Sequence, residues 1–335
     1  MRRARVEEIL SRAASKRVLV IGDLMLDEFV WGKVGRISPE APVPVVEVTG
    51  ESFYPGGAAN VARNLRGFVR GASVVGMIGN DRGGQQLRQL LHEGGIETAD
   101  ILADASFQTI VKTRIIARQQ QVVRVDREQI RTPTGDQIGH VVATVRARLP
   151  EFDAIVFEDY GKGFLTAELA AQVSELAGAA GKIVTADPNP RHSIEWSNVT
   201  AVKPNRSEAF LAAGMPWRDA TEPAAEDSAL HDVGRALLRK WDTRYLLITL
   251  GEHGMMLFER DGAPHHIPTK ARQVFDVSGA GDTAIALFTL ALTCEATPRE
   301  AAEIANHASA VVVGKLGTAT VDREELLQSF TSTED

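Results

Sequence analysis

Residues 276–284, DVSGAGDTA, combine residue types that hold an anion with one that moves a proton. Gly279 and Gly281 let the backbone approach a ligand, and the apolar run that follows predicts a helix whose free N–H groups point at that ligand. Asp282 is placed to accept a proton from a substrate hydroxyl. Three hypotheses fit this stretch: an anion cradle beside a catalytic base, a dinucleotide-binding turn, and a helix cap.

The anion-cradle hypothesis accounts for the most residues. Backbone amides of Gly279, Ala280 and Gly281 would stabilise the negative charge that develops during phosphoryl transfer, with Asp282 as general base. Aspartate is also a common helix cap, so this stretch alone supports the catalytic and capping interpretations equally.

The dinucleotide hypothesis rests on a match of residues 279–284 to G-x-G-x-x-A. Such a turn follows a buried strand and usually opens its binding unit. Here the preceding TKARQVFDV is polar and the motif lies near the C-terminus, so the context disfavours NAD.

A second glycine turn, YPGGAAN at residues 54–60, also opens a predicted helix. Gly56 and Gly57 allow close backbone approach, and Asn60 can hydrogen-bond a polyol; the alternative is a plain helix start. Asp23 and Asp27 follow the first predicted strand, where two carboxylates suit paired sugar hydroxyls, unless one of them is a cap.

The segment KPNRSE at residues 203–208 ends a short predicted strand and begins a helix. Asn205 and Glu208 can orient Mg²⁺-bound water and phosphate, but N-x-x-E is also a capping box. The chain contains no G-x-x-x-x-G-K-[ST], which excludes a P-loop enzyme.

Hydrophobic periodicity predicts the elements that must position these residues. β-branched runs at residues 17–23, 73–79, 154–159, 182–188 and 245–251 alternate with helical stretches, several of which end in glycine. This pattern predicts a doubly wound α/β fold, a mainly parallel sheet with helices on both faces. Ligands of such sheets bind at the carboxyl ends of the strands, which selects residues 22–23, 158–159, 187–188 and 249–254 as candidates.

Two segments interrupt this alternation and predict a small antiparallel flap (lid), at about residues 28–52 and 105–127. Pro42 and Pro44 suit an edge strand. Lys112, Arg114 and Arg118 share period-two parity, so one regular strand would put them on one face. That face is either solvated or a basic lid over an anionic ligand; with Lys162 in the YGKG turn it would suit a phosphorylated sugar.

Composition limits the class of protein. With 335 residues the chain is long enough for one large α/β domain, and a net charge of -7 disfavours a nucleic-acid partner. A single cysteine, Cys294, excludes an intrachain disulfide and fits a reducing compartment. No signal peptide and no apolar run long enough to span a membrane is present, so we expect a cytoplasmic protein with no membrane or nucleic-acid partner.

In their order along the chain, GGAAN at 56–60, N-x-x-E at 205–208 and D-x-x-G-A-G-D at 276–282 resemble the ribokinase or PfkB-type carbohydrate kinases. The resemblance covers nearly the whole chain. Residues 22–48, 112–126 and EDYGKG at 158–163 are similar to the kinases that phosphorylate D-glycero-β-D-manno-heptose 7-phosphate at O1, in lipopolysaccharide-core precursor synthesis. Two positions depart from the family's frequent residues: Ser278 replaces Thr, and Glu158 replaces Ser, which puts the role of that position in doubt.

The resemblance implies a single ribokinase-like domain over residues 1–335, using ATP, Mg²⁺ and a monovalent cation such as K⁺. It implies Asp282 as base, the 279–281 amides as anion hole, and Glu208 near Mg²⁺ through water. It places Thr249, Gly251, Gly254, Asn205 and Asn306 at the nucleotide. It also implies that the sugar is bound by Asp23, Asp27, Gly56, Gly57 and Asn60.

The flap would supply a lid and a homodimer contact. In many bacteria this domain is fused to a nucleotidyltransferase, and we expect only the kinase half here. Two other classes remain as alternatives: a sugar-phosphate or nucleotide sensor that binds without catalysis, and an NAD oxidoreductase.

Overall fold

The computed structural model describes residues 1–118, 120–192, 194–220, 223–271 and 274–331. Within them the main sheet has eight strands. In spatial order these are β14 (His265–Ile267), β13 (Met255–Glu259), β12 (Tyr245–Thr249), β11 (Ala201–Val202), β10 (Ile183–Asp187), β9 (Ala154–Glu158), β1 (Arg17–Gly22) and β4 (Gly71–Val75). The strands from β12 to β4 pair in parallel, and β13 and β14 add an antiparallel edge.

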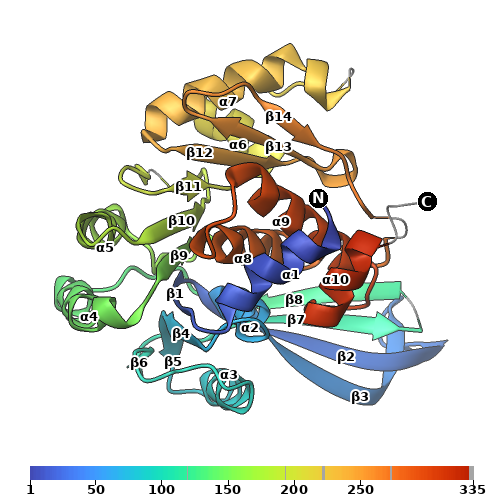
Figure 1. The fold of residues 1–335 in the computed structure, drawn as a ribbon. Coiled ribbons are helices and arrows are strands. Elements are labelled where there is room, and N and C mark those ends of the chain that lie inside the picture. Colours follow the sequence, from blue (N-terminus) through green and yellow to red (C-terminus); the bar gives the residue numbers. More distant parts are fainter. Residues whose placement is uncertain (119, 193, 221–222, 272–273, 332–335) are drawn as a thin grey trace.

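Helices cover both faces of this sheet, as the sequence predicts (Figure 1). One face carries α1 (Arg3–Ala13), α2 (Ala58–Arg66), α8 (Ala280–Thr293), α9 (Pro298–Val313) and α10 (Arg323–Thr331), with α3 (Arg82–Glu93) in the same hydrophobic cluster. The other face carries α4 (Gly135–Arg148), α5 (Ala167–Ala179), α6 (Arg206–Ala213) and α7 (Ser228–Trp241).

Strand β1 shows why the sheet is buried on both sides. Val18 and Val20 belong to one hydrophobic cluster, and Leu19 and Ile21 to the other. Since successive side chains of a strand point to opposite faces, a run of apolar residues serves both layers at once. The predicted doubly wound α/β fold class is confirmed.

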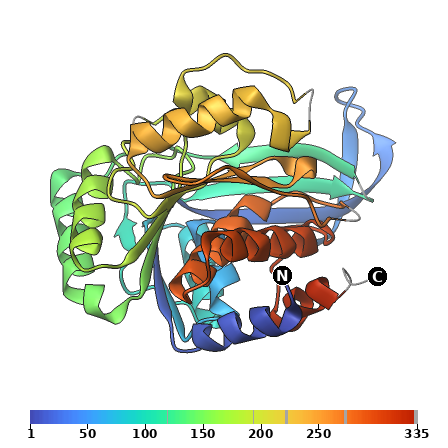
Figure 2. The same cartoon turned by 45° about the horizontal axis from the view of Figure 1, so that its top comes forward.

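The predicted flap is a four-stranded sheet that projects from the body (Figures 1 and 2). Its strands, in spatial order, are β3 (Pro44–Gly57), β2 (Leu24–Ile37), β7 (Ile110–Ala117) and β8 (Gln120–Arg127). Pro44 begins the edge strand β3, as expected for a residue without an N–H. The pairs β2–β3 and β7–β8 are antiparallel, but β2 and β7 pair in parallel, so the lid is a mixed sheet.

Two strand predictions need correction. The run predicted as one strand at 73–79 is divided between β4 and β5 (Met77–Gly79), and β5 pairs with β6 (Leu102–Asp104) in a separate sheet. Gly76 lies at the break, where a Cβ would be 2.6 Å from the Gly22 carbonyl oxygen. The run at 109–126 is a hairpin rather than one strand, which removes Arg118 from the parity of Lys112 and Arg114.

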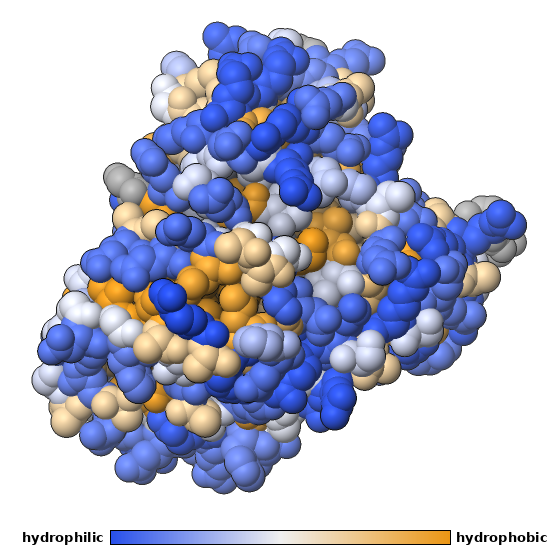
Figure 3. Space-filling view, turned by 60° about the vertical axis from the view of Figure 1, so that its left-hand side comes forward, coloured by the Kyte–Doolittle hydropathy of each residue, from blue (hydrophilic) through white to orange (hydrophobic). Residues whose placement is uncertain are grey.

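The outer surface agrees with this layering. The side of the molecule shown in Figure 3 is largely hydrophilic, with hydrophobic side chains gathered in patches, because the apolar faces of the helices pack inward. In the described part of the chain, none of the helices has both the length and the apolar character needed to cross a bilayer.

Candidate active site

Asp282 lies in the first turn of α8 and is only 3% exposed. Its carboxylate does not cap the helix. One oxygen accepts a hydrogen bond from the Asn60 amide at 2.7 Å and the other accepts one from the Tyr160 hydroxyl at 2.7 Å. Burial raises the pKa of Asp282 above its ordinary value, and these two donors act in the opposite direction. The capping interpretation is therefore wrong, and the carboxylate is held as an oriented acceptor.

The glycines before Asp282 shape the start of α8. Gly279 is the N-cap residue, with φ of 80° in the left-handed region, and a Cβ there would lie 2.8 Å from the Asn60 amide nitrogen. The Ala280 N–H donates to the Val277 carbonyl at 3.2 Å. In the part of the chain that the structure describes, the N–H groups of Gly279 and Gly281 have no acceptor, so these two amides fit the predicted anion hole better than that of Ala280.

A buried ion pair lies beneath this turn. Lys203 Nζ is 2.7 Å from Asp187 Oδ2, and Lys203 is 3% exposed. A Cβ on Gly281 would lie 3.5 Å from that Nζ, so the cation adjoins the anion hole. Burial opposes the charge of Lys203, but Asp187 raises the lysine pKa above its ordinary value. Burial raises the pKa of Asp187 to about 7.

Glu158, whose role the sequence left in doubt, ends β9 beside these groups. It is 1% exposed, and its Oε2 has no hydrogen-bond partner among the described residues. Burial, and then the charges of Asp187 and Asp282, raise the pKa of Glu158 well above its ordinary value. We infer that this carboxyl is in its neutral form when Asp187 and Asp282 are ionised.

Asp23 holds the turn that carries Tyr160. It is 2% exposed, and its oxygens accept backbone N–H bonds from Tyr160 (2.9 Å), Lys162 (2.9 Å) and Phe164 (3.1 Å). The turn includes Gly161 with φ of 71°. In this structure Asp23 therefore fixes the loop after β9, and direct contact with a sugar stays a prediction.

The lid brings Asp27 and two of its predicted cations together. Arg114 Nη1 lies 2.5 Å from Asp27 Oδ1, and Lys112 Nζ lies 5.3 Å from the centre of the Tyr160 ring. Lys162 adds a third positive charge nearby and pairs with Glu128 at 2.6 Å. The cluster faces the Asp282 side of the lid.

The prediction that Arg118 shares this face is wrong. It follows the last residue of β7, is exposed, and has φ of 60° in the turn of the hairpin. The alternation of side chains between the two faces holds only within a regular strand, and β7 ends one residue earlier.

The glycine turn of β3 packs against the same carboxylates. A Cβ on Gly56 would lie 2.5 Å from Asp27 Oδ2, and one on Gly57 would lie 2.5 Å from the Asp23 carbonyl oxygen. Gly57 has φ of 59° and is the N-cap residue of α2, the helix of Asn60. The turn thus sets the position of Asn60, whose amide N–H donates to Asp282. Its Oδ1 has no hydrogen-bond partner among the described residues, so contact with a polyol stays a prediction.

On the other side of the α8 turn is a cavity of 440 Å³. Four of the predicted nucleotide residues line it: Thr249, Gly251, Gly254 and Asn306. Ala280, Gly281 and Ala284 of α8 line it as well, together with apolar side chains such as Met255. The cavity therefore runs from an apolar region up to the anion hole, as a site for a base and its phosphates requires.

Asn205 and Glu208 form a capping box at the start of α6. The Asn205 side chain accepts from the Glu208 N–H at 3.0 Å, and Glu208 Oε2 accepts from the Asn205 N–H at 2.7 Å. The charge of Glu208 also acts on Asp187 and Lys203, so the pair adjoins the site while it caps its helix.

The model of the pfkB family carbohydrate kinases matches residues 15–325 of this chain. The chain belongs to this family. The bifunctional protein HldE of Desulfatibacillum aliphaticivorans is 40% identical over 95% of the chain and 63% of its own length, and that of Geobacter sulfurreducens is 42% identical over 98% and 66%. The chain thus spans less than two thirds of the length of these relatives.

Solved structures show the same fold at low identity. Ribokinase of Arabidopsis thaliana, complexed with ribose and ATP, has a TM-score of 0.69 at 18% identity, covering 94% of this chain and 99% of that one. Phosphofructokinase-2 of Escherichia coli has a TM-score of 0.75 at 17% identity, covering 96% and 100%. The dinucleotide hypothesis is wrong, since the chain is a pfkB family kinase and no strand among the described residues directly precedes α8.

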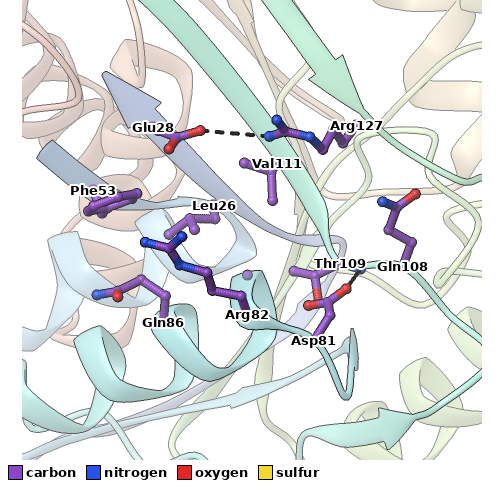
Figure 4. Close-up of a pocket in the computed structure, with 11 residues that line it drawn as sticks. Leu26, Glu28, Phe53, Asp81, Arg82, Gln86, Gln108, Thr109, Val111 and Arg127 are labelled. Carbon is purple, nitrogen blue, oxygen red and sulfur yellow. Dashed lines mark hydrogen bonds and ion pairs between the residues drawn. The ribbon is translucent and has the colours of Figure 1, made fainter. Parts of the chain in front are cut away.

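A second cavity, of 310 Å³, lies behind the lid and is separate from the kinase site (Figure 4). Leu26 and Glu28 line it, whereas Asp27 between them faces Asp282's side of the lid. Its acids already have partners: Glu28 pairs with Arg127 at 3.8 Å, and Asp81 accepts the Thr109 N–H at 2.8 Å. The first contact joins two strands of the lid, and the second connects the residue before β7 to the start of α3.

Sequence reasoning left four residues of this kinase site without a role: Glu158, Tyr160, Asp187 and Lys203. Asp187 and Glu158 stand at the strand ends that the doubly wound pattern selects, and Lys203 directly precedes the N-x-x-E motif. Tyr160 lies in the EDYGKG motif, directly after the selected pair 158–159, but its contact with Asp282 spans 122 residues of sequence, so the motif alone did not give it a role.

Proposed function

We propose that this pfkB family kinase transfers the γ-phosphoryl group of ATP to O1 of D-glycero-β-D-manno-heptose 7-phosphate, in lipopolysaccharide-core precursor synthesis. The observation that carries the proposal is the pairing of an oriented base, Asp282, and free amides at the start of α8 with a cationic lid cluster. The relatives named bifunctional protein HldE support the choice within the family.

The proposed reaction is an in-line displacement. Asp282 accepts the proton of the sugar hydroxyl as its oxygen bonds to the γ-phosphorus, the bond to the β–γ bridging oxygen breaks, and ADP leaves with that electron pair. The amides of Gly279 and Gly281, with Lys203 beneath them, stabilise the charge on the transferring group. Both products remain on the enzyme until the lid releases them.

A sugar phosphate fits the lid better than a neutral sugar. Lys112, Arg114 and Lys162 gather where Asp27, Asp126 and Glu128 supply three negative charges. Asp126 also pairs with Arg124 at 2.9 Å, and this fourth cation leaves the cluster with a net positive charge. The 7-phosphate of the proposed acceptor would complete the pairing of these cations. A neutral sugar would leave them partly buried without that partner.

ATP and Mg²⁺ have suitable residues. The 440 Å³ cavity suits the nucleotide, and Glu208 would reach the metal through water, because the described residues contain no group of three acidic, histidine or cysteine side chains able to hold a metal by themselves. Mg²⁺ commonly binds through substrate phosphates and water. The phosphofructokinase-2 of Escherichia coli has been solved with potassium, and we extend K⁺ to this kinase as part of the proposal. Buried Cys294 fits the cytoplasm, where we place the reaction.

A panel of acceptors tests the substrate. We expect kcat/KM for the heptose 7-phosphate to exceed that for a free nucleoside by about tenfold or more, because the nucleoside lacks the phosphate that makes a charged contact with the lid. Fructose 6-phosphate keeps a phosphate and tests recognition of the rest of the sugar, and we expect the heptose 7-phosphate to be the better substrate of the two. ADP release at fixed ATP measures this. Equal or better turnover of either competitor would overturn the heptose assignment, and binding without ATP consumption would indicate the sensor alternative.

A lid variant checks the reason for that preference. Lys112→Met should raise KM for the sugar phosphate about tenfold and leave KM for ATP unchanged, since the lid lies away from the nucleotide cavity. Equal changes in both constants would contradict the placement of the phosphate at Lys112.

We also propose that two copies associate through the lid. The described part of the lid exposes large apolar side chains: Ile37, Val43, Val48, Val122, Val123 and Val125. Strand β8 is exposed throughout and is an edge with free backbone groups. Val123→Glu should convert a dimer into a monomer in analytical ultracentrifugation, whereas Leu211→Glu, at another exposed apolar site, on α6, should not. A monomeric native chain would refute the contact.

A further inference from the structure

Tyr160 stands between the catalytic base and the lid, and neither the family match nor the sequence motifs give it a role. Its hydroxyl donates to Asp282 Oδ1 at 2.7 Å, and the Lys112 ammonium lies 5.3 Å from its ring centre. We propose that Tyr160 is a positioning residue: its hydroxyl fixes the orientation of the Asp282 carboxylate, and its ring connects that carboxylate to Lys112 on the lid.

The hydroxyl has a defined place because its loop is fixed. Three backbone N–H groups of residues 160–164 converge on the buried carboxylate of Asp23, and Asp159 Oδ1 accepts the Gly161 N–H at 2.8 Å. The loop begins directly after β9, so the sheet itself positions its first residue. Tyr160 is thus pre-organised, and its hydrogen bond costs little further ordering.

The two donors leave Asp282 able to act. A carboxylate has about four lone-pair sites, so Tyr160 and Asn60 together occupy half of them. With one donor on each oxygen, the carboxylate cannot rotate without breaking a bond. The remaining acceptor sites then point in a constant direction toward the substrate hydroxyl.

Tyr160 contacts the lid through the face of its ring, over which the Lys112 ammonium lies. A cation over an aromatic face is attracted by the negative charge of the ring. The position of Lys112 on β7 therefore depends partly on Tyr160, and Lys112 is the lid cation to which we assign the sugar phosphate. A sugar phosphate bound at Lys112 would act on the same side chain that orients the base.

Several charged groups surround Asp282, and their pKa values depend on its protonation state. They are Lys203 after β11, Asp27 on β2, Glu158 on β9 and Asp187 on β10. Among the groups acting on the carboxylate, only Asn60 and Tyr160 lower its pKa by direct hydrogen bonds. Loss of the Tyr160 hydroxyl should therefore raise the pKa of Asp282.

The test is Tyr160→Phe, which keeps the ring and removes the donor. We expect the acid limb of the kcat profile to move upward by about one pH unit, the size of a hydrogen bond to a charged group. Tyr245→Phe, at the start of β12 and far from the site, is the matched control and should leave the profile unchanged. An acid limb that stays in place in Tyr160→Phe would overturn the proposal, because a purely structural defect lowers kcat without moving the limb.

A second measurement needs no substrate. The chain has three tyrosines, so ¹³Cζ-tyrosine labelling gives three resonances, which Tyr160→Phe assigns. The Tyr160 resonance should follow the protonation of Asp282 and lose that titration in Asp282→Asn; a resonance without that step would refute the hydrogen bond. The test by the pH profile of kcat rests on the proposed kinase function. If none of the acceptors in the panel is phosphorylated, the tyrosine resonance still tests the hydrogen bond between Tyr160 and Asp282.

The link to the lid is tested by a double-mutant cycle. If Tyr160 joins Lys112 to the base, the effects of Lys112→Met and Tyr160→Phe on kcat should be non-additive by about threefold or more. Additive effects would remove the lid from the proposal.

Discussion

Asp282→Asn is expected to lower kcat by about 10² or more while ATP binding stays nearly unchanged. Asparagine preserves the size of the side chain but cannot take the proton of the sugar hydroxyl. The nucleotide cavity is lined by other parts of α8 and by the loop after β12, so the affinity for ATP, measured by calorimetry, should hold. The comparison variant is Asp322→Asn, at an exposed aspartate whose side chain accepts the Glu325 N–H at 2.8 Å at the start of α10; asparagine can accept the same bond, and turnover should be retained.

The dependence of kcat on pH is a second test of Asp282 as the general base. Burial raises the pKa of Asp282, so the base takes up a proton at a higher pH than an ordinary aspartate, and turnover falls as the pH decreases through that value. Asp187, with a pKa raised to about 7, titrates in the same site. The fall of turnover at low pH is due to Asp282 only if the residual activity of Asp282→Asn does not show it. Near-normal turnover in that variant would exclude Asp282 as the base.

The parts of the site that lie on regular elements could be predicted from the sequence. Parallel strands meet at one edge, so the ends of β1, β9 and β10 identified Asp23, Glu158 and Asp187 as neighbours before any contact was known. Glycine patterns likewise identified the turns before α2 and α8. These predictions depend on local conformation and on strand order.

The roles of individual carboxylates could not be predicted, because they depend on partners distant in sequence. Asp23 and Asp27 have the same residue type and follow the same strand, yet Asp23 accepts three backbone N–H groups and Asp27 pairs with Arg114 on the lid. The sequence suggested only a polyol contact for Asn60, whereas its amide N–H donates to Asp282. No spacing rule distinguishes these outcomes.

Arg118 shows a different limit. Arg118 is an even number of residues from Lys112, but an even spacing puts two side chains on the same face only within one continuous strand. The run 109–126 has no glycine or proline to mark its turn, and the chain reverses at Arg118 through a positive φ in a residue that rarely adopts one. A turn made without its usual residues is invisible to pattern analysis.

Gly279→Ala is expected to lower kcat by about 10², the effect of misplacing one donor of an anion hole, because alanine keeps the N–H but shifts the turn that carries it. The added Cβ would lie 2.8 Å from the Asn60 amide nitrogen, which must move, and that amide also orients Asp282. The substitution therefore disturbs the base and the anion hole together. The φ of 80° adds a backbone cost of about 1–2 kcal/mol, which acts on stability rather than on catalysis.

Gly181→Ala separates these two effects. Gly181 follows α5 with φ of 65°, and a Cβ there would meet no atom within 4 Å, so the variant bears the backbone cost alone. Gly181→Ala should lose about 1–2 kcal/mol in the free energy of unfolding, measured by urea denaturation, and Gly279→Ala at least as much because it also meets the Asn60 amide; only Gly279→Ala should lose turnover. If both keep their kcat, Gly279 serves the turn and not the phosphoryl group, and the anion hole must be assigned to the Gly281 amide and Lys203 without it.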